Sequence, residues 1–369
     1  MQLNAQKHTP RKVLVAPLDW GLGHATRCIP LITAFREQGC EVVMAADGTA
    51  AALLRQTFPH LRLLDLKGYR VRYSRNAGLL PFALLLQLPR LLAVMRYEKR
   101  WLAALLEKEQ FDLVVSDNRP GLWTRKVTTV YITHQLQILS GMGAWMDRLL
   151  RSLHLRIMRK FDHIWVPDIE GTASMAGMLS HPPHYPHKVR YIGPISRFKP
   201  GTSIPQDIDL LIVLSGPEPQ RSMLEASLLK ETAAFQGKIV LVQGKENSNI
   251  PNLGDKVSVI ALADPETLNR LVMRAKLVIC RSGYTSLMDL LRLQVKAVLI
   301  PTPGQTEQEY LAQRMEALNC FPYIAQNEAS LSKAIKKASA FSYQFPFKDA
   351  MFHEHEAAIT TLLQKMAIE

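Results

Sequence analysis

A short loop near the N-terminus, LDWGLGH at residues 18–24, holds residue types that can bind and activate a substrate. Gly21 and Gly23 allow a tight turn and a close backbone approach at a helix start, where anions and polar ligands bind. His24 could be a general base or a ligand to a polar substrate, and Asp19 is a second base candidate or the group that orients the base. The third glycine of the dinucleotide-binding fingerprint GxGxxG is missing, because Thr26 stands there, so the loop does not predict a dinucleotide site. The alternative is a plain strand-to-helix turn with a structural histidine.

A second polar cluster follows an apolar strand in the C-terminal half. That strand runs into Arg281, Ser282 and Gly283, and a helix then opens with Thr285 and Ser286. Backbone N–H groups and hydroxyls at a helix start suit a diphosphate. Polar residues in such positions are often only caps, which is the competing interpretation.

Two further features extend this cluster. Asp289 lies about one turn beyond Ser286 on the same helix face, where a carboxylate can accept both hydroxyls of a ribose. The sequence PTPGQTEQ, residues 301–308, forms another loop-to-helix junction after the next strand. Its candidate ligand-binding side chains are those of Gln305, Glu307 and Gln308.

Short apolar strands that alternate with amphipathic helices must position these loops. In the first half we expect strands at 13–17, 41–46, 61–66, 112–116, 129–133, 163–167 and 190–193, and a helix at 25–38. Residues 196–206, rich in Pro and Gly, read as a linker. Repeated strand–helix–strand units predict a parallel sheet with helices on both faces.

The alternation restarts after the linker. We expect strands at 210–214, 238–243, 257–260, 277–280 and 297–301, and helices at 220–235, 265–274, 285–293 and 307–318. The final segment, 349–369, looks like one amphipathic helix. Two such α/β halves normally hold a ligand in the cleft between them, at the carboxyl ends of their strands.

The chain length and composition agree with this organisation. A chain of 369 residues with 47% hydrophobic and 21% charged residues is globular and has room for two domains. We expect an N-terminal domain at 1–200, a C-terminal domain at 201–345, and a terminal helix at 346–369 that packs back toward the N-terminal domain. Four single cysteines indicate reduced thiols in a cytoplasmic protein, without a zinc site or disulfide framework. The polar N-terminus does not predict a signal peptide.

The net charge of +13 requires an anionic partner or surface, and most of it comes from one region. Residues 60–160 contain 18 Lys and Arg but only 7 Asp and Glu. The same region holds an apolar stretch at 79–95, which two prolines and an arginine make unsuitable for spanning a bilayer. Docking on anionic lipid and ordinary solvated helix faces are the two open interpretations. The residues expected on a membrane or acceptor side are Phe82, Leu85, Arg96, Lys99 and Arg100. No nucleic-acid reader motif is present.

The C-terminal run RSGYTSLMDLL, a strand, and PTPGQTEQEYLAQRM together resemble the donor-binding region of GT-B glycosyltransferases of family 28. That family includes the bacterial enzyme that adds N-acetylglucosamine to a lipid-linked muropeptide. In the resemblance, Gly283 falls on a motif glycine, Ser286 on a threonine, Asp289 on the ribose-binding glutamate and Gln308 on a glutamine that contacts the donor sugar.

The resemblance extends to the loops of both halves. Gly21, Gly23 and His24 fall on the N-terminal glycine-rich loop and its histidine, and Ser215 and Gly216 fall on a second glycine loop that approaches the diphosphate. It implies an α/β GT-B fold of two Rossmann-like domains, with the donor, a UDP-sugar, on the C-terminal half. It also implies an inverting, metal-independent transfer without a cofactor.

The chain departs from the family pattern at two places. Asp289 is one methylene shorter than glutamate, and the family's His-Glu-Gln-Asn stretch is reduced to His134 and Gln135. The acceptor is therefore not carried over; a lipid-linked or membrane-proximal acceptor at the inner face of the cytoplasmic membrane is the expectation. A nucleotide-sugar 2-epimerase on the same fold and a catalytically inactive lipid-docking relative are the alternatives.

Overall fold

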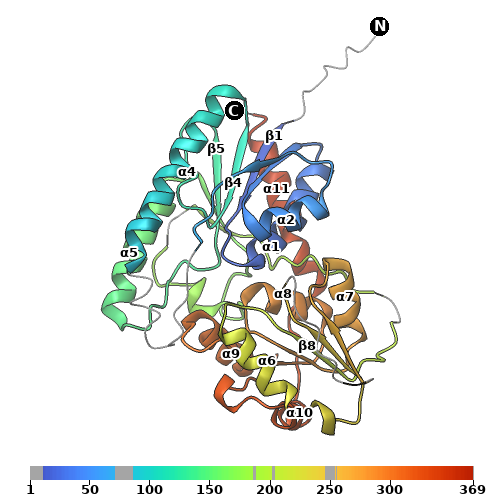
Figure 1. Ribbon diagram of the computed structural model, residues 1–369. Helices are drawn as coiled ribbons and strands as arrows, with labels where there is room; N and C mark the ends of the chain where they lie inside the picture. The colour runs from blue at the N-terminus through green and yellow to red at the C-terminus, as the bar shows by residue number, and fades with distance from the viewer. Residues whose placement is uncertain are drawn as a thin grey trace.

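The computed structural model describes residues 11–70, 86–185, 188–201, 204–245, 254 and 256–368. In these ranges the chain forms two α/β domains, one above the other in Figure 1, each built on a parallel sheet. The expected division of the chain into two sheets therefore exists in the structure.

The N-terminal sheet has seven strands in the order β3-β2-β1-β4-β5-β6-β7, and all of its pairings are parallel. The strands are β1 (Lys12–Pro17), β2 (Glu41–Ala46), β3 (Leu63–Asp65), β4 (Leu113–Asp117), β5 (Thr128–Ile132), β6 (His163–Val166) and β7 (Val189–Tyr191). Their order reverses between β1 and β4, and the loops that leave the two strands at such a switch point diverge and leave room for a ligand.

The C-terminal sheet has five parallel strands in the order β10-β9-β8-β11-β12. The strands are β8 (Leu210–Val213), β9 (Ile239–Val242), β10 (Val257–Ile260), β11 (Val278–Cys280) and β12 (Ala297–Leu299). The switch point lies between β8 and β11. All twelve strands overlap the ranges expected from the sequence. Most of them are short buried apolar runs between polar loops, whereas the strands at three sheet edges, β3, β7 and β10, contain no fully buried residue.

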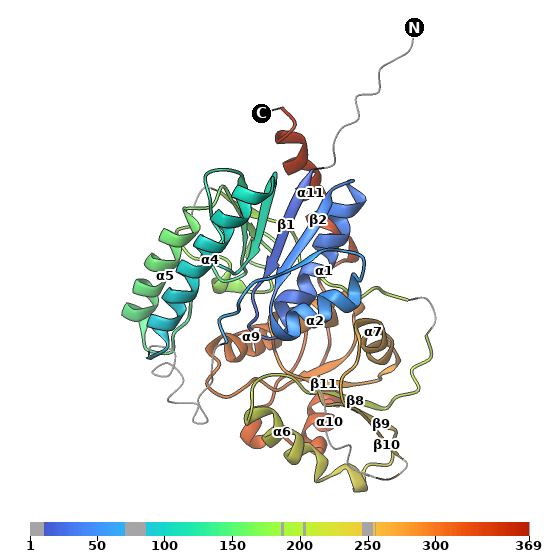
Figure 2. The same ribbon diagram turned by 45° about the horizontal axis from the view of Figure 1, so that its top comes forward.

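Helices cover the faces of both sheets. They are α1 (Leu22–Glu37), α2 (Gly48–Thr57), α4 (Leu88–Lys108), α5 (Ala144–Met158), α6 (Gln220–Leu229), α7 (Pro265–Arg274), α8 (Tyr284–Leu293), α9 (Thr306–Ala317), α10 (Leu331–Ala340) and α11 (Glu354–Lys365). Figures 1 and 2 show α4 and α5 beside each other on one flank of the N-terminal domain. None of the helices in the described ranges is long and apolar enough to cross a membrane.

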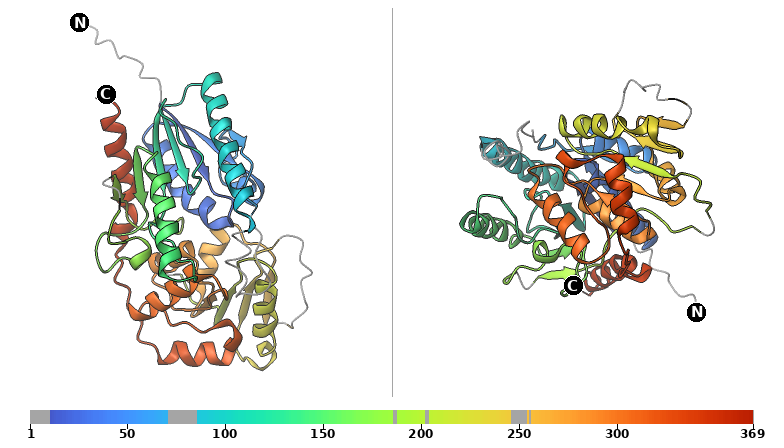
Figure 3. Two further views of the ribbon diagram at one scale, coloured as in Figure 1. Left: turned by 90° about the vertical axis from the view of Figure 1, so that its left-hand side faces the viewer. Right: turned by 90° about the horizontal axis from the view of Figure 1, so that it is seen from below.

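The C-terminal segment connects the two domains. Phe352, in a short 3-10 helix at Asp349–His353, packs in the C-terminal core, whereas Ala358, Ile359 and Leu362 of α11 pack in the N-terminal core. In Figure 3, α11 runs along the N-terminal domain toward the C-terminus. The single helix expected over 349–369 is wrong, because the chain first makes the 3-10 turn and α11 begins only at Glu354.

Candidate active site

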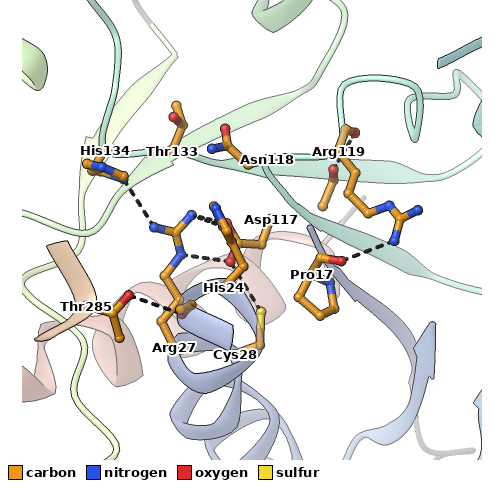
Figure 4. A network of polar contacts seen from close by, with 12 residues as sticks. Pro17, His24, Arg27, Cys28, Asp117, Asn118, Arg119, Thr133, His134 and Thr285 are labelled. Atoms are coloured by element: carbon orange, nitrogen blue, oxygen red, sulfur yellow. Dashed lines mark hydrogen bonds and ion pairs between the residues drawn. The ribbon is translucent and has the colours of Figure 1, made fainter. Parts of the chain in front are cut away.

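His24 lies in the first turn of α1, directly above the switch point of the N-terminal sheet. Asp117 is the last residue of β4 and pairs in register with Pro17 at the end of β1. This register brings the Asp117 carboxylate under the start of α1, where its Oδ1 lies 3.2 Å from Nδ1 of His24 (Figure 4). Nη2 of Arg27 lies 2.9 Å from the same nitrogen, so Nδ1 can either donate to Asp117 or accept from Arg27. The arrangement in which Nδ1 donates to Asp117 leaves Nε2 free to accept a proton.

Arg27, one turn beyond His24 on α1, neutralises Asp117. Its Nε donates to Oδ2 of Asp117 at 2.7 Å, and its Nη2 donates to Oδ1. Both side chains are buried. Burial alone would raise the pKa of Asp117, but Arg27 and then His24 outweigh it and hold that pKa below its usual range. Asp117 therefore stays ionised at neutral pH.

The environment also keeps His24 neutral. Burial and then the Arg27 guanidinium lower the pKa of His24, and Asp117 opposes them only in part. Within the described residues, no side chain hydrogen-bonds Nε2 of His24. A neutral imidazole with one nitrogen unengaged suits a general base.

Asp19, the other predicted base, is engaged elsewhere. Its Oδ1 accepts a hydrogen bond from the backbone N–H of Tyr69 at 2.7 Å, and its Oδ2 accepts one from that of Arg70 at 3.0 Å. Gly68 is required beside it, since a Cβ there would lie 2.0 Å from Asp19 Oδ2. The carboxylate thus holds the loop after β3, and of the two candidates the geometry favours His24 as the base.

On the C-terminal side, Arg281 follows β11 directly and is 1% exposed. Its Nη atoms donate to the backbone carbonyls of Gln220, Ile300 and Pro301, while its Nε has no partner. No carboxylate pairs with this guanidinium among the described residues, and burial lowers the pKa of Arg281 to about 10. A buried cation without a counter-ion is costly, and a bound anion would offset that cost.

The second unpartnered group is the hydroxyl of Thr302, in the loop after β12. Thr302 is buried and its Oγ1 has no hydrogen-bond partner. Gly216, in the loop after β8, has φ +93°, and a Cβ there would lie 3.5 Å from Thr302 Oγ1 and 4.0 Å from Arg281 Nε. Two buried, unsatisfied groups thus face the exposed Gly216 at the switch point of the C-terminal sheet. We call them the Arg281–Thr302 pair.

The two domains meet where α8 faces α1. Thr285 Oγ1 donates to the backbone carbonyl of Gly23 at 3.1 Å, and a Cβ on Gly23 would lie 3.1 Å from the same oxygen. A side chain at position 23 would thus crowd Thr285 where the domains approach each other, whereas Gly21 has φ +79° at the start of α1. The loop that carries His24 therefore lies against the helix start that carries Thr285.

Two side chains that were predicted to bind the sugar donor form hydrogen bonds to other residues of the protein. Asp289 is buried, and its Oδ1 accepts a hydrogen bond from Ser196 at 2.5 Å. The side chain of Gln308 accepts from the Thr302 N–H at 2.9 Å and donates to Gln305. The ribose contact of Asp289 and the sugar contact of Gln308 remain predictions, and each requires these bonds to open.

Of the other residues predicted to bind the donor, some lie in the loops of the C-terminal domain, and one contacts the N-terminal domain. Ser215 is exposed beside Gly216, Ser286 is half-buried beside Gly283, and Ser282 donates to the backbone carbonyl of Gln308 at 2.7 Å. Glu307 reaches across to the N-terminal domain, where it accepts a hydrogen bond from His134 at 2.7 Å and another from Gln135.

Only part of the predicted membrane side can be placed. Phe82 and Leu85 lie outside the described residues, and Arg96 and Arg100 are exposed on α4. Lys99 is half-buried on α4, where its ammonium lies 3.3 Å from the ring centroid of Trp123 and donates to the Trp123 carbonyl at 2.5 Å. Burial lowers the pKa of Lys99, and its place on the membrane or acceptor side stays a prediction.

Sequence reasoning missed Arg27, Asp117 and Thr302 and did not give His134 a role. Arg27 and Asp117 lie 90 residues apart, and only the sheet register joins them. A signal was nonetheless present, because β4 is an apolar run that ends in a carboxylate at the predicted ligand edge.

Comparison with known proteins agrees with this arrangement. Residues 221–361 match the glycosyltransferase family 28 C-terminal domain. This matched range contains the loops of Arg281 and Thr302, whereas Gly216 lies before it. The chain is a glycosyltransferase. No curated protein sequence matches it.

Solved structures show that the whole chain has the GT-B fold. The glycotransferase of kitacinnamycin is 13% identical with a TM-score of 0.68, and the alignment covers 97% of this chain and 99% of that one. The spinosyn rhamnosyltransferase SpnG in complex with thymidine diphosphate is 14% identical with a TM-score of 0.62, covering 96% and 100%. MurG of Acinetobacter baumannii is 13% identical with a TM-score of 0.54, covering 97% and 100%.

Proposed function

We propose that this glycosyltransferase transfers a sugar, with inversion and without a metal, from a nucleoside diphosphate sugar to an acceptor hydroxyl. The Arg281–Thr302 pair is the observation that carries the donor assignment. A diphosphate at the loop of Gly216 would give the buried guanidinium a counter-ion and the Thr302 hydroxyl an acceptor. We take the donor to be a UDP-sugar from the family resemblance; SpnG, which was solved with thymidine diphosphate, makes thymidine nucleotides the first competitor to test.

The proposed general base is His24, which lies in the N-terminal domain, across from the Arg281–Thr302 pair. Its Nε2 would take the proton of the acceptor hydroxyl as that oxygen attacks the sugar carbon, while the bond from this carbon to the diphosphate breaks. Asp117 would stabilise the imidazolium that forms. The start of α8 and the Arg281–Thr302 pair would stabilise the charge that develops on the leaving diphosphate.

We further propose that the acceptor is lipid-linked or membrane-proximal, and that the enzyme docks on the inner face of the cytoplasmic membrane through α4 and α5. These helices expose large apolar side chains, Leu88, Leu92, Trp145, Leu149 and Leu153. Exposed arginines lie on the same helices, among them Arg96 and Arg100. Apolar groups that enter the lipid interface and cations that meet anionic headgroups favour binding together.

A product assay tests the proposed function. The protein is incubated with UDP- and dTDP-sugars, with and without lipid-linked and soluble acceptors, and both the free nucleoside diphosphate and the sugar product are measured. Acceptor-dependent release together with a glycosylated product supports the transferase. A 2-epimer of the donor sugar without transfer would indicate the epimerase, and nucleotide binding without turnover would indicate an inactive relative.

A further inference from the structure

One oxygen of the Asp289 carboxylate is bound by the linker that joins the two domains. The Ser196 hydroxyl donates to Oδ1 of Asp289 at 2.5 Å, and both residues are buried. Among the described residues, no other group donates a hydrogen bond to this carboxylate. Oδ1 is therefore occupied by a hydroxyl of the protein itself, and Oδ2 is the oxygen that remains for a ligand.

Ser196 is held in this place by contacts of its own. Its Oγ accepts a hydrogen bond from the Phe198 N–H at 3.1 Å, and its carbonyl accepts one from Nη1 of Arg292 at 2.9 Å. The backbone nitrogen of Ile195 lies 3.1 Å from the sulfur of Met288 on α8. A serine hydroxyl has one proton to donate, and here the carboxylate receives it. The linker thus fixes the serine on Oδ1.

The other oxygen of Asp289, Oδ2, lies 4.0 Å from Nε of Arg197, which is too far for a direct hydrogen bond. The Arg197 side chain is 13% exposed, and its Nε is buried without a hydrogen-bond partner. The oxygen of a ligand hydroxyl can lie within about 2.9 Å of both atoms, accept from Nε and donate to Oδ2. The gap between Asp289 and Arg197 therefore suits one hydroxyl group.

This gap lies along α8 from the proposed diphosphate site. Asp289 follows Ser286 by three residues, or about 4.5 Å along the helix axis, on the same face. Burial lowers the pKa of Arg197, and Asp289 and then Asp264, which lies between β10 and α7, oppose this effect. The loop after β10 is thus close to the gap, at the carboxyl edge of the C-terminal sheet. In a nucleoside diphosphate the pentose follows the diphosphate directly, so its hydroxyls are the groups that can reach the gap.

We propose that Ser196 is a specificity-determining residue, which occupies Oδ1 of Asp289 and so limits this carboxylate to a single hydroxyl of the donor's pentose. The 3′-hydroxyl of a deoxyribose also provides that hydroxyl, so the site accepts 2′-deoxyribonucleoside diphosphates about as well as ribonucleoside diphosphates. A contact with both hydroxyls of a ribose needs both oxygens, for which the Ser196 bond would have to open. This inference rests on the proposed donor site.

The test compares nucleotides that differ only in the 2′-hydroxyl. Calorimetry measures the affinities of two pairs, UDP with dUDP and 5-methyluridine diphosphate with dTDP, so the outcome does not depend on which base the site prefers. Burial raises the pKa of Asp289 to about 6, so titrations at about pH 8 keep the carboxylate ionised. The proteins are wild type, Ser196→Ala and Ser196→Thr, which keeps the hydroxyl.

The matched control is Ser180→Ala, in the N-terminal domain. Ser180 is also buried, and its hydroxyl donates to a buried aspartate, Asp168, at 2.7 Å. The variant therefore removes the same kind of bond but none that involves Asp289. A general loss of rigidity would affect Ser180→Ala and Ser196→Ala alike, whereas the release of Oδ1 is expected only in Ser196→Ala.

Wild type and Ser180→Ala should bind the two members of a pair with affinities within about threefold of each other, because only one hydroxyl is bound. In Ser196→Ala the freed Oδ1 can accept the second hydroxyl. The ribose member should then gain about tenfold over its deoxyribose partner, the effect of one charge-assisted hydrogen bond. Ser196→Thr should keep the wild-type ratio.

Two results would overturn the inference. One is a wild-type preference of about tenfold or more for the ribose member, which needs no variant to fold. The other is an unchanged ratio in folded Ser196→Ala. Both leave the donor assignment intact, since the nucleotides still bind. Absence of binding by all four nucleotides would instead refute the proposed donor site, and this inference with it.

Discussion

Arg27, on α1, and Arg281, directly after β11, are both buried arginines, yet their surroundings differ. Arg27 donates through two nitrogens to Asp117, which is ionised and equally buried. Arg281 has only backbone carbonyls as acceptors, and its Nε has none. The N-terminal domain therefore contains the counter-ion of its buried arginine, whereas the described residues of the C-terminal domain provide none for Arg281.

This difference separates the roles of the two domains. A buried arginine that is paired with a carboxylate can hold neighbouring groups in place, as Arg27 and Asp117 do for His24. A buried arginine without a counter-ion is stabilised when an anion binds beside it, so it suits a substrate site. We therefore expect variants on the N-terminal side to change turnover and stability, and variants at Arg281 to change donor affinity.

The largest effect is expected from His24→Ala. Removal of the proposed general base should lower kcat by about 10²–10⁴, because the acceptor hydroxyl then has no group to take its proton. Donor affinity, measured by calorimetry, should change little. If donor affinity collapses together with turnover, His24 belongs to the nucleotide site, and the separation of the two domains is wrong.

Asp117→Asn should cause the largest loss of folding stability. It leaves the buried Arg27 guanidinium without a counter-ion, which costs about 3–5 kcal/mol of unfolding free energy. Arg281→Met removes a cation that has no ionic partner among the described residues and leaves backbone carbonyls unpaired, at a cost of about 1–3 kcal/mol. Urea unfolding of both variants measures this difference. Equal losses of unfolding free energy would contradict the contrast between an arginine that has a buried counter-ion and one that has none among the described residues.

The pH dependence of stability should have opposite signs for two buried aspartates. The pKa of Asp117 is lowered in the fold, so its contribution is present at neutral pH and is lost as the pH falls below the unfolded value of about 4. Burial raises the pKa of Asp289 to about 6, so its contribution is present at low pH and is lost as the pH rises toward 6.

Asp289→Asn isolates the second contribution, since an amide resembles the protonated acid. Between pH 4 and 6, the unfolding free energy of wild type should fall relative to that of the variant by up to about 1.4 kcal/mol per pH unit. The measurement is urea unfolding at several pH values. Parallel curves for the two proteins would mean that Asp289 is ionised throughout this range.

The smallest expected effect concerns membrane binding, and it should be confined to the N-terminal domain. Trp145→Ala/Leu149→Ala removes two side chains of α5 that are 63% and 47% exposed, and should weaken co-sedimentation with anionic vesicles. Met223→Ala, on α6 of the C-terminal domain and 56% exposed, is the control and should bind as wild type does. Absence of vesicle binding by folded wild type at low salt would refute docking.

The sequence predicted the strands and loops of this fold well, because short buried strands and glycine turns are local features. It singled out His24 and Arg281 for the same reason, whereas Gly216 came from the family resemblance, and the roles of all three stay predictions. It could not reveal that Arg27 neutralises Asp117, or that Asp289 faces Ser196 across 93 residues, because those contacts depend on how the sheets and domains assemble. Nor does anything local show that the Lys99 amine lies over the ring of Trp123.

The most direct test of the central claim is calorimetric titration of the protein with UDP and dTDP. Wild type should bind at least one of them, and Arg281→Met should bind it about 10- to 100-fold more weakly, the effect of losing charge-assisted hydrogen bonds. Arg314→Met is the matched control, because Arg314 also donates to backbone carbonyls, those of Thr172 and Ser174, and it should bind as wild type does. Equal affinity of folded Arg281→Met and wild type would contradict the account, as would the absence of nucleoside diphosphate binding by wild type.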